Sequence, residues 1–461
     1  MWLFRVYIPG SVLGLLFSEV VLLFSVFLLA VIINSDVDPE IWLLYSDGWM
    51  RLSVIVGGVV LSMYFQDLYE IVRVRSRIAL IQQVCIAIGL AFLLQALLSY
   101  TAPDWVLPRW ITIIACGLTL LLLPTWRLIY STVALHAVSA RKVLFLGSSK
   151  VACDINSRIR QHPELGMATL GFVDDALDSE LSEDTCHLGQ LKDFRSIISS
   201  TKPDLIVVGM SERRSRLPIN QLLDLRFAGI RIEDAATTYE TTFGRVCLQE
   251  IRPSQLVFST DLGARPGIVR LQTVYSTLIA LAGTVITLPL LILIAALVKF
   301  TSRGPVFYRQ LRVGLNGTKY TVYKFRSMRH DAEADTGPTY ALRDDPRATF
   351  VGRLLRRLRL DELPQLFNVL KGEMSIVGPR PERPEFVDTL AEKIPFYRQR
   401  LCIKPGITGW AQINHKYGDS FEDTSIKLEY DLYYIKNLSP TLDAYIIFHT
   451  LKVMLLSRGS R

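Results

Sequence analysis

LDELPQLFNVLKG, residues 360–372, places two adjacent carboxylates after a run of arginines, Arg353, Arg356, Arg357 and Arg359. Pro364 suits the first turn of a helix, because its missing N–H would be unpaired there, and Gly372 is a natural end. Asp361 and Glu362 therefore lie near a helix N-terminus, where unpaired N–H groups favour phosphate. Carboxylates in this setting can hold a metal ion or attack phosphorus. The alternative is an ordinary helix cap among surface arginines.

The composition indicates a membrane protein that handles anionic ligands. Half of the 461 residues are hydrophobic and the mean hydropathy is +0.30, which is too apolar for a purely soluble enzyme. The formal net charge of +8 suits nucleic acid, anionic lipid headgroups or phosphorylated ligands. The many apolar runs favour the last two, so no nucleic acid is expected as a partner. The six cysteines form no C-x-x-C pair, which argues against a zinc site and predicts reduced thiols.

Four apolar runs open the sequence, at residues 12–33, 52–65, 78–98 and 110–133. Most approach the roughly 20 residues that a helix needs to cross a bilayer. The second and fourth runs are followed by basic residues, Arg73, Arg75, Arg77, Arg141 and Lys142, whereas the other two loops are mostly acidic. The positive-inside rule therefore places both ends of a four-helix transmembrane bundle, residues 1–138, on the cytoplasmic face. The alternative is a buried helical core, which the charge asymmetry of the loops disfavours.

Residues 139–265 have the rhythm of a Rossmann-like, doubly wound α/β domain. KVLFLG, residues 142–147, predicts a buried parallel strand that ends in a glycine turn. A helix to Gln161 follows, and the later pattern predicts strands at residues 170–173 and 204–209 and a helix at residues 219–228.

The glycine turn of this domain carries only part of a dinucleotide-binding fingerprint. Ser149 stands where the fingerprint requires a glycine so that pyrophosphate can approach the backbone. Asp174 and Asp175 end the second strand, where a carboxylate that binds ribose would lie. Two alternatives stay open, a nucleotide-binding domain and a regulatory or dimerising module, and the second is favoured. A dimerising module would make the protein a homodimer.

A further apolar run, residues 271–298, contains Leu288 and Pro289 in its middle and has basic residues on both sides. If it crossed the bilayer, the rest of the chain would lie outside the cell, against the positive charge at its far end. Proline disrupts a helix and pushes the preceding residue away from helical geometry. We therefore predict a re-entrant helix, residues 271–300, that bends at Leu288 and Pro289 and returns to the cytoplasmic face. The alternative is a kinked span.

The chain beyond residue 304 is rich in motifs that combine basic and aromatic residues. In YKFRSM, residues 323–328, a phenylalanine separates Lys324 from Arg326, a pattern that suits either a phosphate grip or an amphipathic strand. SIVGPRP, residues 375–381, is a rigid turn with Arg380 at its tip, suited to clamping a phosphate. Asp431 adds a carboxylate on an aromatic helix.

Four motifs of this part occur in a characteristic order, namely KFRSM (324–328), LDELPQLFNVLKGEMSIVGPRP (360–381), KPGITGWAQIN (404–414) and LEYDLYYIKN (428–437). They resemble the catalytic domain of the bacterial sugar transferases, also called monotopic phosphoglycosyl transferases. With the re-entrant helix, the resemblance covers residues 266–461, of which residues 304–461 form the catalytic α/β part. The preceding bundle and α/β domain resemble the long form of the family, the polyprenyl glycosylphosphotransferases of exopolysaccharide and O-antigen assembly.

The resemblance implies transfer of a sugar-1-phosphate from a UDP-sugar to undecaprenyl phosphate, with release of UMP. This reaction is the initiating step of exopolysaccharide, O-antigen or capsule synthesis. The implied location is the bacterial inner membrane, with a multi-pass anchor in the lipid bilayer and the catalytic part on the cytoplasmic face.

The resemblance also assigns roles to single residues. It places the attacking aspartate, which forms a covalent phosphosugar intermediate, at Asp361 with Mg²⁺ bound close by, and its dyad partner at Glu362. The phosphate-binding basic residues of the family fall on Lys324, Arg356 and Arg380. In the family, serine often precedes the re-entrant proline, and this chain has leucine there, so the predicted bend depends more heavily on Pro289.

Two other functions are compatible with the sequence. One is a membrane-anchored nucleotide sensor or scaffold whose working part is the α/β domain. The other is a metal-independent transferase in which the lipid phosphate attacks the donor directly and the carboxylates only position it. No residue in the sequence distinguishes glucose, galactose or an N-acetylated sugar.

Overall fold

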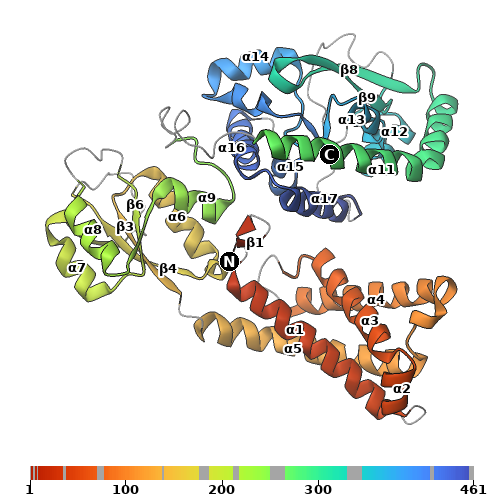
Figure 1. The fold of residues 1–461 in the computed structure, drawn as a ribbon, viewed down its shortest axis with the longest axis horizontal. Coiled ribbons are helices and arrows are strands. Elements are labelled where there is room, and N and C mark those ends of the chain that lie inside the picture. The colour runs from red at the N-terminus through yellow and green to blue at the C-terminus, as the bar shows by residue number, and fades with distance from the viewer. Residues whose placement is uncertain are drawn as a thin grey trace. The chain divides into compact units, whose positions relative to one another are not determined.

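The computed structural model describes residues 2–3, 6–7, 9–34, 38–69, 77–137, 140–175, 186–210, 217–249, 265–329, 345–415 and 420–455. The chain divides into two compact units, residues 7–235 and residues 236–461 together with residues 2–6. The bar of Figure 1 runs from red to yellow-green over the first unit and from green to blue over the second. Two short strands, β1 (Trp2–Leu3) and β2 (Val6–Tyr7), lie at the N-terminus.

Four long apolar helices open the first unit: α1 (Gly10–Ile33), α3 (Gly48–Phe65), α4 (Arg77–Thr101) and α5 (Arg109–Ala137). Between them lie α2 (Pro39–Tyr45) and η1 (Pro103–Trp105). Helices α1 and α4 both pack against α3 and α5, around a core that includes Phe27, Met63 and Ile111.

Each of these four helices is long and apolar enough to cross a bilayer, which indicates a membrane protein. Arg73 and Arg75, on which the predicted orientation partly rests, lie outside the described residues. A transmembrane bundle with both ends on the cytoplasmic face stays a prediction.

A buried ion pair lies among these helices. Arg127 of α5 pairs with Glu19 of α1, with Nε 2.6 Å from Oε1, and its Nη1 donates to the Leu68 carbonyl at 2.7 Å. The same guanidinium lies over the ring of Tyr69. Charges in an apolar interior are tolerated when they are paired and hydrogen-bonded. The ion pair therefore fixes the positions of α1, α5 and the segment after α3 relative to one another.

The rest of the first unit is a parallel five-stranded sheet with the order β5-β4-β3-β6-β7. Its strands are β3 (Arg141–Leu146), β4 (Met167–Val173), β5 (His187–Gly189), β6 (Leu205–Val208) and β7 (Arg231–Asp234). The intervening helices are α6 (Lys150–Gln161), η2 (Pro163–Leu165), η3 (Leu191–Asp193), α7 (Phe194–Thr201) and α8 (Ile219–Phe227).

The predicted Rossmann-like fold is confirmed, with β3, β4 and β6 at the predicted strands. Strands β5 and β7 were not predicted. They are short edge strands whose residues are only partly buried, so neither carries the apolar run by which a central strand is recognised.

The second unit is a mixed α/β structure. Its helices are α9 (Ala235–Phe243), α11 (Pro266–Thr301), α12 (Phe350–Arg357), α13 (Gln365–Leu370), α14 (Pro384–Lys393), α15 (Trp410–Asn414), α16 (Phe421–Asn437) and α17 (Pro440–Leu455). Short 3₁₀ turns are η4 (Leu315–Gly317), η5 (Leu360–Glu362) and η6 (Tyr397–Cys402). Strands β8 (Phe307–Val313) and β9 (Lys319–Phe325) pair antiparallel, and β10 (Ser375–Val377) and β11 (Gly406–Thr408) pair parallel.

The segment after strand β7, which the sequence places in the α/β domain, packs against α16 of the second unit. Lys436 Nζ lies 2.9 Å from Glu240 of α9, and Arg245 Nε lies 3.1 Å from Glu429. The indole N–H of Trp410 donates to the Gly244 carbonyl at 2.8 Å. Residues 236–248 thus contribute to the core of the second unit.

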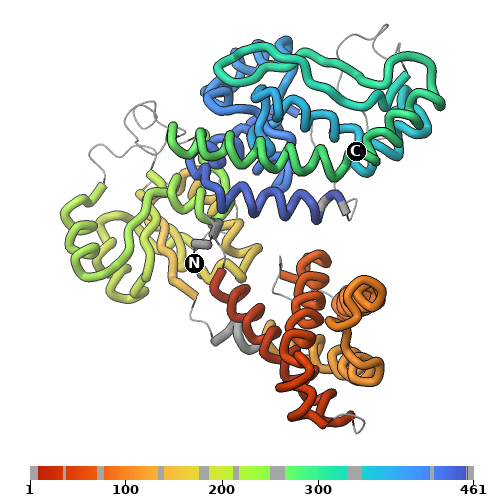
Figure 2. The backbone as a smooth tube through the Cα atoms, turned by 45° about the vertical axis from the view of Figure 1, so that its right-hand side comes forward, coloured from red at the N-terminus to blue at the C-terminus, as the bar shows by residue number. Residues whose placement is uncertain are grey.

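Helix α11 is continuous across Leu288 and Pro289. It lies along one side of the second unit beside α17, as Figures 1 and 2 both show. One face is buried along both halves, by Gln272, Ser276 and Ala280 before the proline and by Leu291, Ile294 and Val298 after it. Large apolar side chains elsewhere on the helix are exposed, Ile286 by 78%, and α11 is also long and apolar enough to cross a bilayer. The bend at Leu288 and Pro289, with return to the same face, stays a prediction.

Candidate active site

The two adjacent carboxylates lie on the turn between α12 and α13. Helix α12 ends at Arg357, and Arg359 adopts a left-handed conformation with φ 56°. This turn redirects the chain so that η5 presents Asp361 and Glu362 just before α13. Pro364 immediately precedes α13, and Gly372 follows it with φ 80°, as the sequence predicted.

Glu362 is held by two cations. Its Oε1 accepts from Lys324 Nζ at 2.6 Å and from Arg380 Nη2 at 2.9 Å. Burial acts against the charged form of Glu362, but Arg380 and Lys324 outweigh it and lower the pKa of the carboxyl group. The Glu362 carboxylate is therefore charged at neutral pH and is committed to orienting these two side chains.

Asp361 differs from its neighbour in being free to react. Its side chain is half-buried, and no hydrogen bond or ion pair joins its carboxylate to any other residue that the structure describes. Burial and the Glu362 carboxylate raise the pKa of Asp361, against the charges of Lys324, Arg356 and Arg380. A carboxylate with free lone pairs beside several cations can approach a phosphorus atom whose oxygens those cations neutralise.

The structure separates the two basic residues of the KFRSM motif. Lys324 reaches Glu362, as described above. Arg326 instead turns to the C-terminal end of α11, where Nη2 donates to the Ser302 carbonyl at 2.8 Å and to Ser302 Oγ at 2.7 Å. Its guanidinium therefore caps the last carbonyls of α11, and phosphate binding by Arg326 stays a prediction. Arg356, on the last turn of α12, is half-buried and acts on Asp361 through its charge.

Arg380 is fixed from behind by a buried ion pair. The Arg400 Nη2 donates to the Arg380 carbonyl at 3.0 Å and lies 2.7 Å from Asp431 Oδ2, while its Nη1 donates to Tyr397 Oη at 2.8 Å. Asp431 is only 2% exposed, and burial raises its pKa while Arg400 opposes the shift. Asp431, which the sequence singled out as a candidate, therefore acts through Arg400 on the position of Arg380.

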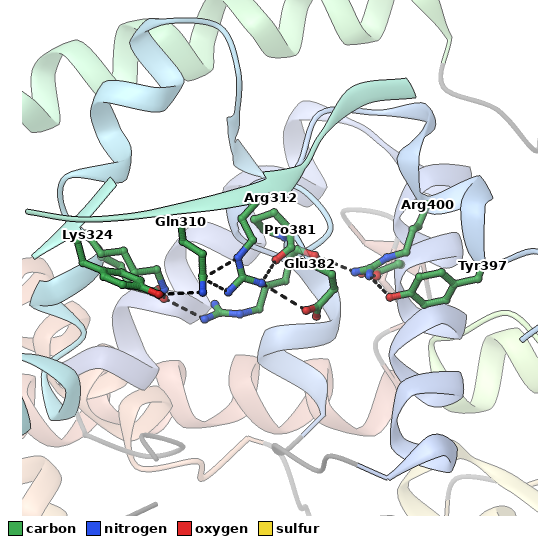
Figure 3. A network of polar contacts seen from close by, with 11 residues as sticks. Gln310, Arg312, Lys324, Pro381, Glu382, Tyr397 and Arg400 are labelled. Carbon is green, nitrogen blue, oxygen red and sulfur yellow. Dashed lines mark hydrogen bonds and ion pairs between the residues drawn. The ribbon is translucent and has the colours of Figure 1, made fainter. Parts of the chain in front are cut away.

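A row of polar side chains extends from Lys324 along strand β8 (Figure 3), in a stretch that the sequence left open between a phosphate grip and an amphipathic strand. Gln310 Oε1 accepts from Arg312 Nη2 at 2.6 Å, and Arg312 Nη1 donates to the Pro381 carbonyl at 2.9 Å. The Glu382 carboxylate lies 3.5 Å from the same guanidinium. The alternation of Gln310 and Arg312 along one strand face was the available signal, and it also ties β8 to the turn that carries Arg380.

The glycines of the two rigid turns allow β10 and β11 to approach closely. A Cβ atom on Gly378 would lie 2.5 Å from the Lys404 carbonyl oxygen, and one on Gly406 would meet the Gly378 nitrogen. Only glycine fits at these positions. The GPRP and KPG motifs therefore fix the strand pair from which Arg380 projects.

The dyad does not by itself supply enough ligands for a metal ion, so a metal bound there would also need ligands from the substrate or water. No group of three histidine, cysteine, aspartate or glutamate side chains among the described residues is placed to hold a metal ion. Lys324 and Arg380 both bind Oε1 of Glu362, whereas neither oxygen of Asp361 has a hydrogen-bond partner among the described residues. Mg²⁺ is commonly bound by one or two carboxylates together with substrate phosphates and water, and Asp361 fits that kind of site.

The glycine turn of the α/β domain is closed by its own carboxylate. Asp174 Oδ2 accepts from the Ser148 N–H at 2.8 Å and from Ser148 Oγ at 2.6 Å, and Asp175 Oδ1 accepts from the Leu191 N–H at 2.9 Å. Residues 64–225 match a family described as a CoA-binding domain. Asp174 thus occupies the Ser148 amide, one of the donors that the phosphate of such a ligand could use.

Comparison with known proteins gives the family of the second unit. Residues 269–457 match the family described as bacterial sugar transferase. The chain is 35% identical over 325 residues to a UDP-glucose:undecaprenyl-phosphate glucose-1-phosphate transferase of Escherichia coli, a match that covers 68% of each chain. It is 43% identical over 222 residues to a UDP-N-acetylgalactosamine-undecaprenyl-phosphate N-acetylgalactosaminephosphotransferase of Aeromonas hydrophila, which covers 48% of this chain and only 52% of that relative.

Another relative is matched over most of its own length. The exopolysaccharide production protein ExoY of Sinorhizobium fredii is 38% identical over 203 residues, which cover 40% of this chain and 86% of the relative. The resemblance seen in the sequence is thereby confirmed: the chain belongs to the bacterial sugar transferase family.

Proposed function

We propose that this protein transfers a sugar-1-phosphate from a UDP-sugar to undecaprenyl phosphate and releases UMP, as the initiating step of exopolysaccharide, O-antigen or capsule synthesis. The observation that carries the proposal is the asymmetry of the dyad. Glu362 holds Lys324 and Arg380 in place, while the adjacent Asp361 keeps its oxygens free. The named activities of the relatives support the same reaction.

The reaction divides into two displacements at one phosphorus atom. In the first, an Asp361 oxygen bonds to the phosphorus that carries the sugar, the bond from this phosphorus to the oxygen bridging it to the UMP phosphate breaks, and UMP leaves with that bridging oxygen. In the second, a phosphate oxygen of undecaprenyl phosphate bonds to the same phosphorus and the Asp361–phosphorus bond breaks. The product is a polyprenyl diphosphate sugar, and Asp361 is returned as a carboxylate.

Each neighbouring side chain has a defined task in this scheme. Lys324 and Arg380 neutralise charge on the diphosphate as UMP leaves, and Glu362 fixes them where that charge develops. Arg356 supplies a further positive charge next to Asp361. Mg²⁺, held by Asp361 and the donor phosphates, would add charge neutralisation at the leaving group.

The position of α11 supports a site at headgroup depth. Helix α13, which directly follows the dyad, packs against α11, and Gln272 near its start and Val298 near its end are both buried. A spanning α11 would draw the polar surface of this unit into the bilayer, at a high cost in free energy. We therefore propose the re-entrant path on the cytoplasmic face of the bacterial inner membrane. There the lipid phosphate and Asp361 meet at the same depth. The homodimer also stays a prediction, which the mass of the detergent-purified protein checks.

The decisive experiment follows UMP release in membranes that contain the full chain, undecaprenyl phosphate and a panel of UDP-sugars. At least one donor should give UMP and a lipid-linked sugar phosphate in equal amounts. With a donor labelled on the phosphate next to the sugar and no lipid acceptor, label should stay on the protein. Asp361→Asn should remove that label. Turnover without a labelled adduct would instead support direct attack by the lipid phosphate.

A further inference from the structure

A second buried polar cluster lies where α11, α16 and α17 meet strand β10. Asp443 of α17 is its centre and is 1% exposed. One carboxylate oxygen accepts from Tyr434 Oη of α16 at 2.6 Å. The other accepts from Gln272 Nε2 of α11 at 2.8 Å and from the hydroxyl group of Tyr275. We call Gln272, Tyr275, Tyr434 and Asp443 the Asp443 cluster.

The Asp443 cluster also binds the backbone of β10. Gln272 Nε2 lies 3.2 Å from the Val377 carbonyl oxygen, and Tyr434 Oη lies 3.3 Å from it. One turn further along α11, Ser276 Oγ contacts Ser375 Oγ at 2.8 Å. Both ends of β10 are therefore bonded to side chains that project from the membrane helix.

The bonded carbonyl group lies three positions before Arg380. Between them stand Gly378, whose backbone packs directly on β11, and Pro379, whose φ is fixed by its ring. Such a stiff connection transmits a displacement of Val377 to Arg380. Arg380 in turn must meet Glu362 within hydrogen-bond distance, since its Nη2 lies 2.9 Å from Glu362 Oε1.

The stability of the protein does not by itself require a polar cluster at this place. An apolar core of the same shape often gives equal or greater stability than buried polar groups, whereas a satisfied polar network fixes one arrangement of the elements that it joins. The Asp443 carboxylate accepts from three donors on two helices. These hydrogen bonds can all form in only one position of α11 relative to β10.

We propose that Asp443 is a positioning residue of the transferase, which holds Gln272 in its hydrogen bond to the Val377 carbonyl and so orients Arg380 toward Glu362. The proposal rests on the proposed function of the dyad. Asp443 would thereby couple the packing position of α11 to the geometry of the donor-phosphate site, because Gln272 and Tyr275 belong to α11.

The test is a double-mutant cycle in the full chain, in membranes, with the donor that the wild type uses. Asp443→Asn replaces one accepting oxygen by an N–H group that faces donors, and it should lower kcat/KM on the order of tenfold. Arg380→Ala should lower it more. The double variant should resemble Arg380→Ala alone, because the aimed side chain is already gone. A purely structural Asp443 would instead give effects that multiply.

Two further variants keep the test decisive. Tyr434→Phe removes one donor to Asp443 without changing shape, and it should show the same dependence on Arg380 if Asp443→Asn fails to fold. Asp388→Asn, on an exposed ion pair with Arg398, should leave kcat/KM unchanged. Full activity in both Asp443→Asn and Tyr434→Phe, or independent effects in the cycle, would overturn the proposal. An inactive wild type would instead reject the proposed function itself.

Discussion

Two glycine turns at the ends of parallel strands behave differently in this molecule. The turn after β3, at Gly147, has φ 94° and precedes a helix, yet Asp174 already occupies the Ser148 amide. The turn after β10, at Gly378, projects Arg380 toward Glu362 beside an Asp361 whose oxygens are free. Both turns are internally hydrogen-bonded, but the second carries an arginine to the dyad. A glycine turn thus indicates a binding site through the charged groups that it brings together, not through its glycine alone.

The strongest way to test this contrast is to remove the free carboxylate. Asp361→Asn keeps the shape of the side chain but eliminates the nucleophile, so we expect UMP release to fall on the order of 10⁴-fold or more. Release of UMP from labelled donor in membranes measures the loss. Asp388→Asn is the matched control, since it alters a surface aspartate of the same unit. Substantial turnover by Asp361→Asn would show that the free carboxylate is not the attacking group.

Removing the arginine of the second turn should have the next largest effect. Arg380→Ala takes away one of the two cations that Glu362 orients, and we expect kcat/KM to fall about 10²- to 10³-fold. Arg380→Lys should recover only part of the loss, because a lysine lacks the planar fork of arginine. Steady-state kinetics with varied UDP-sugar separates the change in KM from the change in kcat. Equal activity of all three proteins would remove Arg380 from the site.

The dyad also predicts the direction of a pH dependence. Asp361 must be ionised to attack, and burial together with the Glu362 carboxylate raises its pKa. Activity should therefore be lost as the pH falls through this raised value, above the range of an ordinary aspartate. Glu362→Gln removes one cause of the increase and should move the acidic limb of kcat/KM to lower pH. Arg380→Ala removes an opposing charge and should move it to higher pH. A limb that stays in place in both variants would belong to another group.

Loss of the Asp431–Arg400 ion pair, which positions Arg380, should have a smaller effect on catalysis and a measurable effect on stability. Asp431→Ala leaves the buried Arg400 guanidinium without its ion-pair partner, which is expected to lower the free energy of unfolding by about 3 kcal/mol or more. We expect kcat/KM to fall about tenfold, because Arg380 keeps its contact with Glu362. Thermal unfolding of the detergent-purified protein and the transfer assay together check the two effects. A loss of stability with unchanged kcat/KM would show that Arg400 does not position Arg380.

The smallest effect is expected at the first turn. Asp174→Ala frees the Ser148 amide, and transfer activity should change by less than about twofold, because this turn takes no part in the reaction. Isothermal titration of the wild type with CoA should show no binding. Binding that is lost in Asp175→Ala or in Asp174→Ala would mean that the turn holds a nucleotide after all.

Local patterns accounted for several elements and failed for specific ones. The apolar run at residues 142–147 and the Pro364–Gly372 signals predicted β3 and α13, because each depends on neighbours in sequence. Strands β5 and β7 have no comparable run, and their pairing depends on the sheet already present. Arg326 looked equivalent to Lys324 in its motif, but the end of α11 takes its guanidinium.

Local sequence patterns were enough to predict the long apolar helices, the Rossmann-like domain, the sugar transferase motifs and the acidic dyad. Hydrophobic periodicity and motif spacing are local properties, so they can be read without coordinates. The three-dimensional contacts were needed to show that Glu362 is paired with two cations while Asp361 is not, and that Arg400 and Asp431 support Arg380. Asp443 and Gln272 are 171 residues apart in the chain, and Glu19 and Arg127 are 108 apart. Burial makes such distant polar contacts necessary, because a polar group removed from water must find its partner wherever the fold places one.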